Sequence, residues 1–178
     1  MKNIQNISVG YIILGNTVDV TDPCYAADVW CRAKIENMQP GKYACQTFIG
    51  DAGSWGRRVI KARIVLDDGS SVAQKTQQQI KSGESWCRLT SIGVDAGLAG
   101  FFANKPDFRE EEWHELCGWM WSNESGDQDS FLKKMSNDTD GFWTRSGYGD
   151  GCYDVYVIQE KVGDAIRTTA AEIRFICL

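Results

Sequence analysis

The chain has 178 residues, of which 43% are hydrophobic and 24% are charged, and its net charge at pH 7 is −5. This length is enough for one domain, spanning residues 1–178, with a substantial hydrophobic core. The acidic balance argues against binding of duplex nucleic acid, which requires a basic face. Seven cysteines without a C-x-x-C pair and an N-terminus without an apolar signal run predict a reduced, cytoplasmic protein. No stretch is long enough to cross a membrane, so we expect no membrane partner.

The N-terminal region is predicted to form a β-hairpin followed by a short helix. Residues 8–14 and 17–20 are strand-like, and the Gly-Asn pair between them is typical of a two-residue turn. The Asp-Pro dipeptide that follows resembles a helix N-cap and first turn. We therefore expect a helix over residues 25–36, with its apolar side chains spaced four apart.

The middle of the chain is predicted to alternate strands with a loop and a polar segment. Alternating apolar residues indicate strands over residues 43–49 and 58–66, separated by a glycine-rich loop. The glutamine-rich stretch 70–85 fits a loop, or a strand followed by an irregular helix. Residues 86–94 return to strand character.

The main helix is predicted after residue 104, where Asn104 resembles a cap and Pro106 a first-turn residue, and it should end near Trp121. Residues 122–130 are polar and predict a mobile loop. Further strands are expected over residues 142–145, 152–158 and 173–177. The apolar face of the helix is expected to consist of Trp113, Leu116, Cys117 and Met120.

These elements predict an α+β fold. We expect a mainly antiparallel sheet, either open or closing toward a sandwich or barrel, with one main amphipathic helix packed on it.

Two glycine-aspartate segments distinguish the chain from an ordinary soluble domain. Residues 93–102 (GVDAGLAGFF) and 146–156 (SGYGDGCYDVY) each place an aspartate among glycines before an aromatic, strand-like run. Because glycine lets a ligand or a neighbouring segment approach the main chain closely, a structured site is predicted here.

Two kinds of ligand fit the polar residues of these segments and their surroundings. Asp22, Asp95 and Asp150 occupy turn-like positions and, if they converge, would suit a hard cation such as Mg²⁺ or Ca²⁺; the alternative is that each caps its own turn. The second kind of ligand is a planar anion such as a nucleotide, since aromatic faces stack on bases and guanidinium groups bind phosphates. The side chains suited to it are Trp55, Arg57, Arg145 and Tyr148, although Arg57 could also be a solvated residue of a hairpin loop.

Established catalytic motifs are missing from the sequence. His114 is the sole histidine, so a metal site with two histidines is excluded and a Cys-His pair has no support in the spacing. An EF-hand match around residue 138 fails because Ser136 and Gly147 stand where carboxylates are required. The glycine-rich loop 50–56 matches neither a P-loop nor a dinucleotide fingerprint.

Three segments taken together resemble a known family. The DPCY motif at residues 22–25, GVDAG with GFF at 93–102, and SGYGDG with Y-x-VY at 146–156 occur in the order found in an uncharacterised family of bacterial and phage proteins, a domain of unknown function. The resemblance implies a small cytoplasmic accessory protein of a bacterium or its phage. By analogy with other phage accessory proteins, it would bind a host protein or a defence signal nucleotide.

The leading hypothesis is a non-enzymatic protein that needs no cofactor and binds a small anionic, nucleotide-like ligand or a host protein. The alternative is a hydrolase of a phosphorylated or nucleotide substrate, in which the three aspartates hold a divalent cation that activates water. A third possibility is a structural or homo-oligomeric protein whose seven tryptophans fill a core and an interface. The predicted ligand-binding residues are Asp22, Tyr25, Trp55, Arg57, Asp95, Gly97, Arg145, Tyr148, Asp150 and Tyr153.

Overall fold

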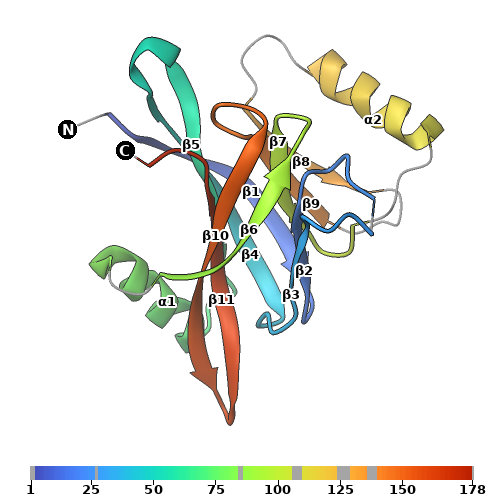
Figure 1. Ribbon diagram of the computed structural model, residues 1–178. Helices are drawn as coiled ribbons and strands as arrows, with labels where there is room; N and C mark the ends of the chain where they lie inside the picture. Colours follow the sequence, from blue (N-terminus) through green and yellow to red (C-terminus); the bar gives the residue numbers. More distant parts are fainter. Residues whose placement is uncertain are drawn as a thin grey trace.

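Two antiparallel β-sheets pack face to face, with one helix on the outer face of each sheet (Figure 1). The computed structural model describes residues 3–26, 28–83, 86–105, 110–123, 129–135 and 140–177. Every pairing between strands in it is antiparallel, and the sheets do not close into a barrel. The predicted α+β class with a mainly antiparallel sheet is therefore confirmed.

The larger sheet has six strands in the order β1 (Gln5–Leu14), β4 (Gly41–Asp51), β5 (Arg57–Leu66), β11 (Ala165–Arg174), β10 (Gly151–Val162) and β6 (Cys87–Val94). The smaller sheet has five strands in the order β3 (Ala33–Ile35), β2 (Val18–Thr21), β7 (Leu98–Phe102), β9 (Asp140–Arg145) and β8 (Ser130–Lys134).

Alternation along the strands places the main core between the two sheets. On β5, Ala62, Ile64 and Leu66 are buried in this core, whereas Lys61 and Arg63 face outward and pair with a carboxylate. On β7 and β9 the same alternation sends one aromatic residue of each neighbouring pair inward and the other toward the second helix. The five-stranded sheet is therefore buried on both faces. The six-stranded sheet has one buried face and one partly charged face.

The polar stretch after β5 forms a regular helix, α1 (Ser71–Ser82). The Ser70 hydroxyl accepts a hydrogen bond from the Ala73 N–H at 3.1 Å, and the helix ends at Gly83, whose φ of 76° is left-handed. α1 packs on the outer face of the six-stranded sheet, where Ile80 contacts a small cluster around Ile158. Residues 70–85 were predicted as a loop, or as a strand followed by an irregular helix. Neither prediction anticipated this regular helix.

The predicted main helix is present as α2 (Glu110–Asn123), which begins with three glutamates and ends two residues beyond Trp121. Leu116 is buried against the aromatic face of the five-stranded sheet, as expected for the apolar side of the helix. Pro106, the Met120 side chain and most of the expected mobile loop 122–130 lie outside the described residues. No helix in the described ranges is long and apolar enough to span a membrane.

The predicted N-terminal hairpin is wrong, although both of its strands exist. β1 pairs with β4 in the larger sheet, and β2 pairs with β3 and β7 in the smaller sheet. All four residues of β2 are buried, so this strand needs neighbours on both edges and cover on both faces. The Gly-Asn pair at residues 15 and 16 consequently joins two sheets instead of two hydrogen-bonded strands.

The helix predicted over residues 25–36 is also wrong, because this segment forms turns followed by β3. Long-range contacts decide its path: the Lys105 ammonium donates a 2.5 Å hydrogen bond to the Tyr25 carbonyl oxygen, and the Gly93 N–H donates to the Cys31 carbonyl oxygen. Trp30, on the same segment, is 92% exposed. Apolar residues spaced four apart therefore do not mark a buried helix face here.

Five further predicted strands are confirmed, either within one or two residues or as parts of longer strands. They span residues 43–49, 58–66, 86–94, 142–145 and 152–158. The last predicted strand is only partly correct, because β11 ends at Arg174. The N–H groups of Phe175 and Ile176 then both donate to the Ile60 carbonyl oxygen. β3 and β8 are not anticipated by the sequence patterns.

Candidate functional site

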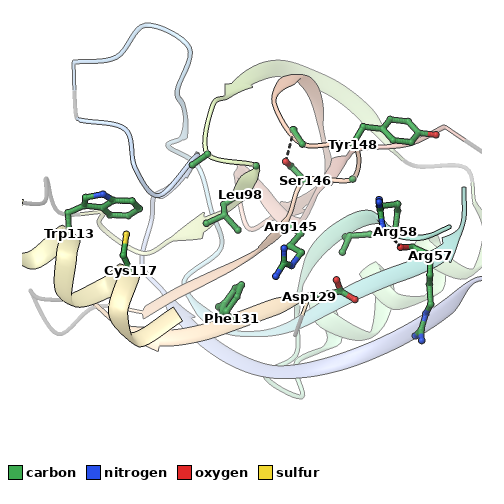
Figure 2. A pocket seen from close by; sticks show the side chains of 15 residues that line it. Arg57, Arg58, Leu98, Trp113, Cys117, Asp129, Phe131, Arg145, Ser146 and Tyr148 are labelled. Atoms are coloured by element: carbon green, nitrogen blue, oxygen red, sulfur yellow. Dashed lines mark hydrogen bonds between the residues drawn. The ribbon is translucent and has the colours of Figure 1, made fainter. Parts of the chain in front are cut away.

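A cavity of about 580 Å³ lies where the outer face of the five-stranded sheet meets α2, the start of β5 and the loop after β9 (Figure 2). The turn between β6 and β7 forms one wall, and the β9–β10 loop forms another. Both glycine-aspartate segments of the sequence thus contribute to one hollow.

The two ends of the cavity differ in character (Figure 2). Trp113 and Cys117 of α2 face Leu98 and Phe131 at the apolar end. This end continues into a buried aromatic cluster, in which the Phe131 ring stacks on Trp143 with 5.7 Å between ring centroids. Phe131 is almost fully buried, so the partly exposed Trp113 is the aromatic side chain of this end that suits the face of a planar ring.

Arginine side chains line the opposite end of the cavity. The Arg57 guanidinium donates to the Gln5 side-chain oxygen at 2.5 Å, and the Arg58 guanidinium donates to the Arg57 carbonyl oxygen at 3.0 Å. Both acceptors are uncharged. Arg145 lies between the two ends, and Asp129 is an acidic residue of the lining. The described lining residues thus contribute three guanidinium groups and one carboxylate, so this part of the surface is positive in a chain whose net charge is −5.

The turn between β6 and β7 is fixed by two aspartates from elsewhere in the chain. One carboxylate oxygen of Asp22 accepts hydrogen bonds from the N–H groups of Asp95 at 3.0 Å and Ala96 at 2.7 Å. The next N–H, that of Gly97, donates to the Asp150 carboxylate at 3.1 Å. Asp22 is fully buried, and its other oxygen accepts from the Cys24 N–H at 2.8 Å. These aspartates therefore shape the cavity wall from behind.

The β9–β10 loop is braced by its own hydrogen bonds. The Ser146 N–H donates to the Gly97 carbonyl oxygen, which joins the two glycine-aspartate segments directly. The Tyr153 hydroxyl lies 2.8 Å from the Ser146 carbonyl oxygen and 2.7 Å from the Gly149 carbonyl oxygen, and shares its hydrogen between them. Burial raises the pKa of Tyr153, so the hydroxyl remains a donor at neutral pH.

Glycine is required at the inner corner of this loop. Gly147 has a left-handed φ of 60°, and a Cβ there would lie 2.8 Å from the Phe175 Cβ. The next residue, Tyr148, is 50% exposed at the edge of the cavity, where its ring lies 5.5 Å from that of Trp55. The loop thus holds an aromatic side chain at the entrance.

The predicted ligand-binding residues fall into three groups. Four of them line the cavity, and Trp55 contacts one of these four. Three others hold the cavity walls from behind without lining it. The last two line an adjoining pocket of about 460 Å³, which shares Ala96 and Trp113 with the main cavity. The cavity-lining group is Arg57, Gly97, Arg145 and Tyr148. The group behind the walls is Asp22, Asp150 and Tyr153, and the group in the adjoining pocket is Tyr25 and Asp95.

The three aspartates predicted as alternative metal ligands do not form a metal centre. Within the described ranges, no group of three or more His, Cys, Asp or Glu side chains is arranged to hold a metal ion. Both carboxylate oxygens of Asp22 accept backbone N–H groups, and Asp150 accepts the Gly97 N–H. Asp22 caps its own turn through the Cys24 N–H, as the turn-capping alternative predicts, whereas Asp150 caps the turn between β6 and β7 through the Gly97 N–H.

Nucleophilic side chains near the cavity are poorly activated. Burial, and then the neighbouring Asp22 carboxylate, raise the pKa of Cys24, and burial raises the pKa of Cys117. Both thiols are therefore protonated at neutral pH and are weak nucleophiles. His114 is exposed on α2 beside Trp113.

Several residues that line the cavity were not predicted from the sequence to bind a ligand. Arg58 adjoins Arg57 in the sequence and could have been included for that reason. Trp113 and Cys117 were recognised only as the apolar face of a helix, and their spacing gives no sign that this face is also the wall of a cavity. Nothing in the sequence singled out Asp129 or Phe131, because β8 itself was not predicted.

Comparison with known proteins identifies a family. No curated protein and no solved structure matches the chain. A family model described as protein of unknown function DUF4241 matches residues 14–169, which contain every wall of the cavity. The chain therefore belongs to the DUF4241 family.

Proposed function

We propose that this protein binds a small anionic ligand with a planar ring, such as a nucleotide, in the cavity beside α2. The observation that carries the proposal is that, among the described residues, Arg57 and Arg58 pair with uncharged acceptors, at one end of a hollow whose other end is apolar and includes Trp113. Guanidinium groups without a carboxylate partner retain their full attraction for a phosphate or carboxylate group.

The arrangement of the lining indicates how such a ligand would lie. The planar group would pack against Trp113, and the anionic group would lie at the arginine end of the cavity near Arg58, with Arg145 between the two (Figure 2). A volume of about 580 Å³ falls within the roughly 300–1,000 Å³ range of small-molecule sites. Because the aspartates behind the wall fix the backbone at residues 95–97, the site is largely formed before binding.

Binding without turnover fits the surroundings better than hydrolysis. The metal-dependent hydrolase needs a set of carboxylate ligands, and the two best candidates, Asp22 and Asp150, are engaged by backbone N–H groups. A host protein as the occupant and a role in the conflict between phage and host stay predictions.

Native mass spectrometry of the protein purified from its natural host tests the proposal first, because a co-purifying nucleotide appears as added mass. Calorimetric titration with adenosine and guanosine mono- and diphosphates then measures affinity. We expect the R57A/R58A double variant to weaken binding at least about 30-fold, since two charge-assisted contacts are lost. Arg167→Ala, on β11, removes an arginine whose described contact is a 3.5 Å hydrogen bond to Asn16 and serves as the matched control. A protein that carries no added mass and binds none of these nucleotides contradicts the proposal.

A further inference from the structure

The outer face of the six-stranded sheet carries a cluster of cations that the cavity does not use. α1 packs over Val65, Ile158 and Ala170 on one part of this face (Figure 1). Beyond it, neighbouring strands place a set of charged side chains in register, Lys61 opposite Arg174 and Arg63 opposite Glu172. We call the three cations with this glutamate the basic platform. Its members are Lys61, Arg63, Arg174 and Glu172.

The positive charge of the basic platform exceeds its negative charge. Glu172 is fully buried, and the Arg63 guanidinium donates two hydrogen bonds to one of its oxygens at 2.9 and 2.7 Å. Arg174 donates to the other oxygen at 2.6 Å, and the Lys61 ammonium lies 3.3 Å from the carboxylate. Among the described residues, Glu172 is the carboxylate that contacts these three cations, and Asp154, which lies opposite Arg174 on β10, pairs with Arg88 at 2.9 Å. The four side chains of the basic platform therefore carry a net charge of +2.

The charges of the cluster shift the pKa values of its members. Burial would raise the pKa of Glu172, but Arg63 and Lys61 outweigh it and lower that pKa. Burial lowers the pKa of Lys61, and Arg63 and Arg174 lower it further, despite the attraction of Glu172. An additional carboxylate near Lys61 would relieve this repulsion.

Aromatic rings hold the cations in place before any partner arrives. The Lys61 ammonium lies 4.6 Å from the centre of the Phe48 ring, and the Arg174 guanidinium lies 3.6 Å from that of Tyr156. Arg63 contacts both Phe48 and Trp86. Side chains ordered in this way lose little conformational entropy on binding an anion. The exposed fractions of the Lys61 and Arg174 side chains, 25% and 32%, leave both within reach of a partner.

We propose that the basic platform is a docking surface for an acidic segment of a partner protein, whose carboxylates pair with Lys61 and Arg174. Charge complementarity specifies an anionic partner, because the platform is positive on a chain of net charge −5. The aromatic rings favour protein over single-stranded nucleic acid. Cations already cover these rings, so the rings cannot also stack with bases.

The test measures fluorescence anisotropy of a labelled decaglutamate peptide, with decaglutamine as the neutral peptide and a labelled ten-nucleotide oligothymidine as the rival anion. We expect decaglutamate to bind and the K61Q/R174Q double variant to weaken this binding at least about tenfold. The R57A/R58A variant removes the same number of charges from the cavity and should leave peptide binding unchanged, which separates this proposal from that for the cavity.

Circular dichroism checks that both variants fold. We expect the K61Q/R174Q variant to fold, because Arg63 still neutralises Glu172 in it. If that variant does not fold, the single Lys61→Met replacement, which keeps both Arg63 hydrogen bonds, should still weaken decaglutamate binding about threefold or more. Equal binding of decaglutamate to the wild type and the folded variants overturns the proposal. So does tighter, platform-dependent binding of oligothymidine.

Discussion

Asp22 and Glu172 are both fully buried carboxylates, but the protein satisfies them in opposite ways. Asp22 accepts three backbone N–H groups, two of which come from residues more than 70 positions away. Glu172 is surrounded by three cationic side chains. The first arrangement fixes the path of the main chain at the cavity wall, whereas the second sets the charge of an outer sheet face. A buried carboxylate can thus determine either shape or surface potential.

Replacing Asp22 should cause the largest loss of stability. In Asp22→Ala, three N–H groups lose a charged acceptor in a buried region, and we expect the free energy of unfolding to fall by about 4 kcal/mol. Urea unfolding followed by tryptophan fluorescence measures this change. Asp28→Ala, which alters an exposed aspartate of the same segment, should cost less than about 0.5 kcal/mol. A loss below about 1 kcal/mol for Asp22→Ala would mean that the turn does not depend on this carboxylate.

Replacing Glu172 should cost somewhat less, and its effect should depend on salt. In Glu172→Gln, three cations lose their counter-charge, and we expect a loss of about 3 kcal/mol, smaller at about 1 M than at about 0.05 M NaCl because salt screens their repulsion. Adding Lys61→Gln to this variant should restore part of the stability. The loss in Asp22→Ala should change little with salt, since it arises from short-range hydrogen bonds. Equal salt dependence of the two variants would remove the distinction between them.

Acid should reduce the contribution of Glu172. The folded protein holds the pKa of this carboxyl below its ordinary value of 4.5, so the unfolded chain binds the proton more readily. The stabilisation is therefore complete above about pH 4.5 and is lost as the pH falls further. We expect the difference in unfolding free energy between the wild type and Glu172→Gln to shrink between about pH 5 and pH 3. A difference that stays constant over this range would contradict the proposed ionisation of Glu172.

The same contrast explains what the sequence could predict. Strands such as β4, β5 and β10 follow from local alternation of apolar residues, which the sequence displays directly. The segment after Asp22 looked helical because an Asp-Pro pair is a typical helix start, but one carboxylate oxygen of Asp22 accepts the N–H groups of residues 95 and 96. One partner of Glu172, Arg63, is 109 residues away. Neither long-range pairing leaves a local pattern.

The candidate site was predictable to a similar extent. Glycines beside aspartates drew attention to the two segments that line the cavity, and these segments meet at Gly97 and Ser146. The aromatic wall was not predictable, since Trp113 and Phe131 look like ordinary core residues. Whether an apolar side chain fills a core or lines a cavity depends on packing in three dimensions.

The smallest expected effect on stability concerns the part of the wall that Asp22 and Asp150 hold. Gly97 has a left-handed φ of 64°, and a Cβ there would lie 3.9 Å from its nearest neighbour, so Gly97→Ala should cost only about 1 kcal/mol through backbone strain. Gly83→Ala, at the end of α1, carries a similar φ of 76° with open space around it, and should cost the same. Only the first change adds a methyl group at the cavity wall. If the cavity is the ligand site, the two variants should match in urea unfolding and differ in nucleotide titration, where Gly97→Ala alone weakens binding. Matched affinities would place the ligand away from this wall, even if the stability prediction holds.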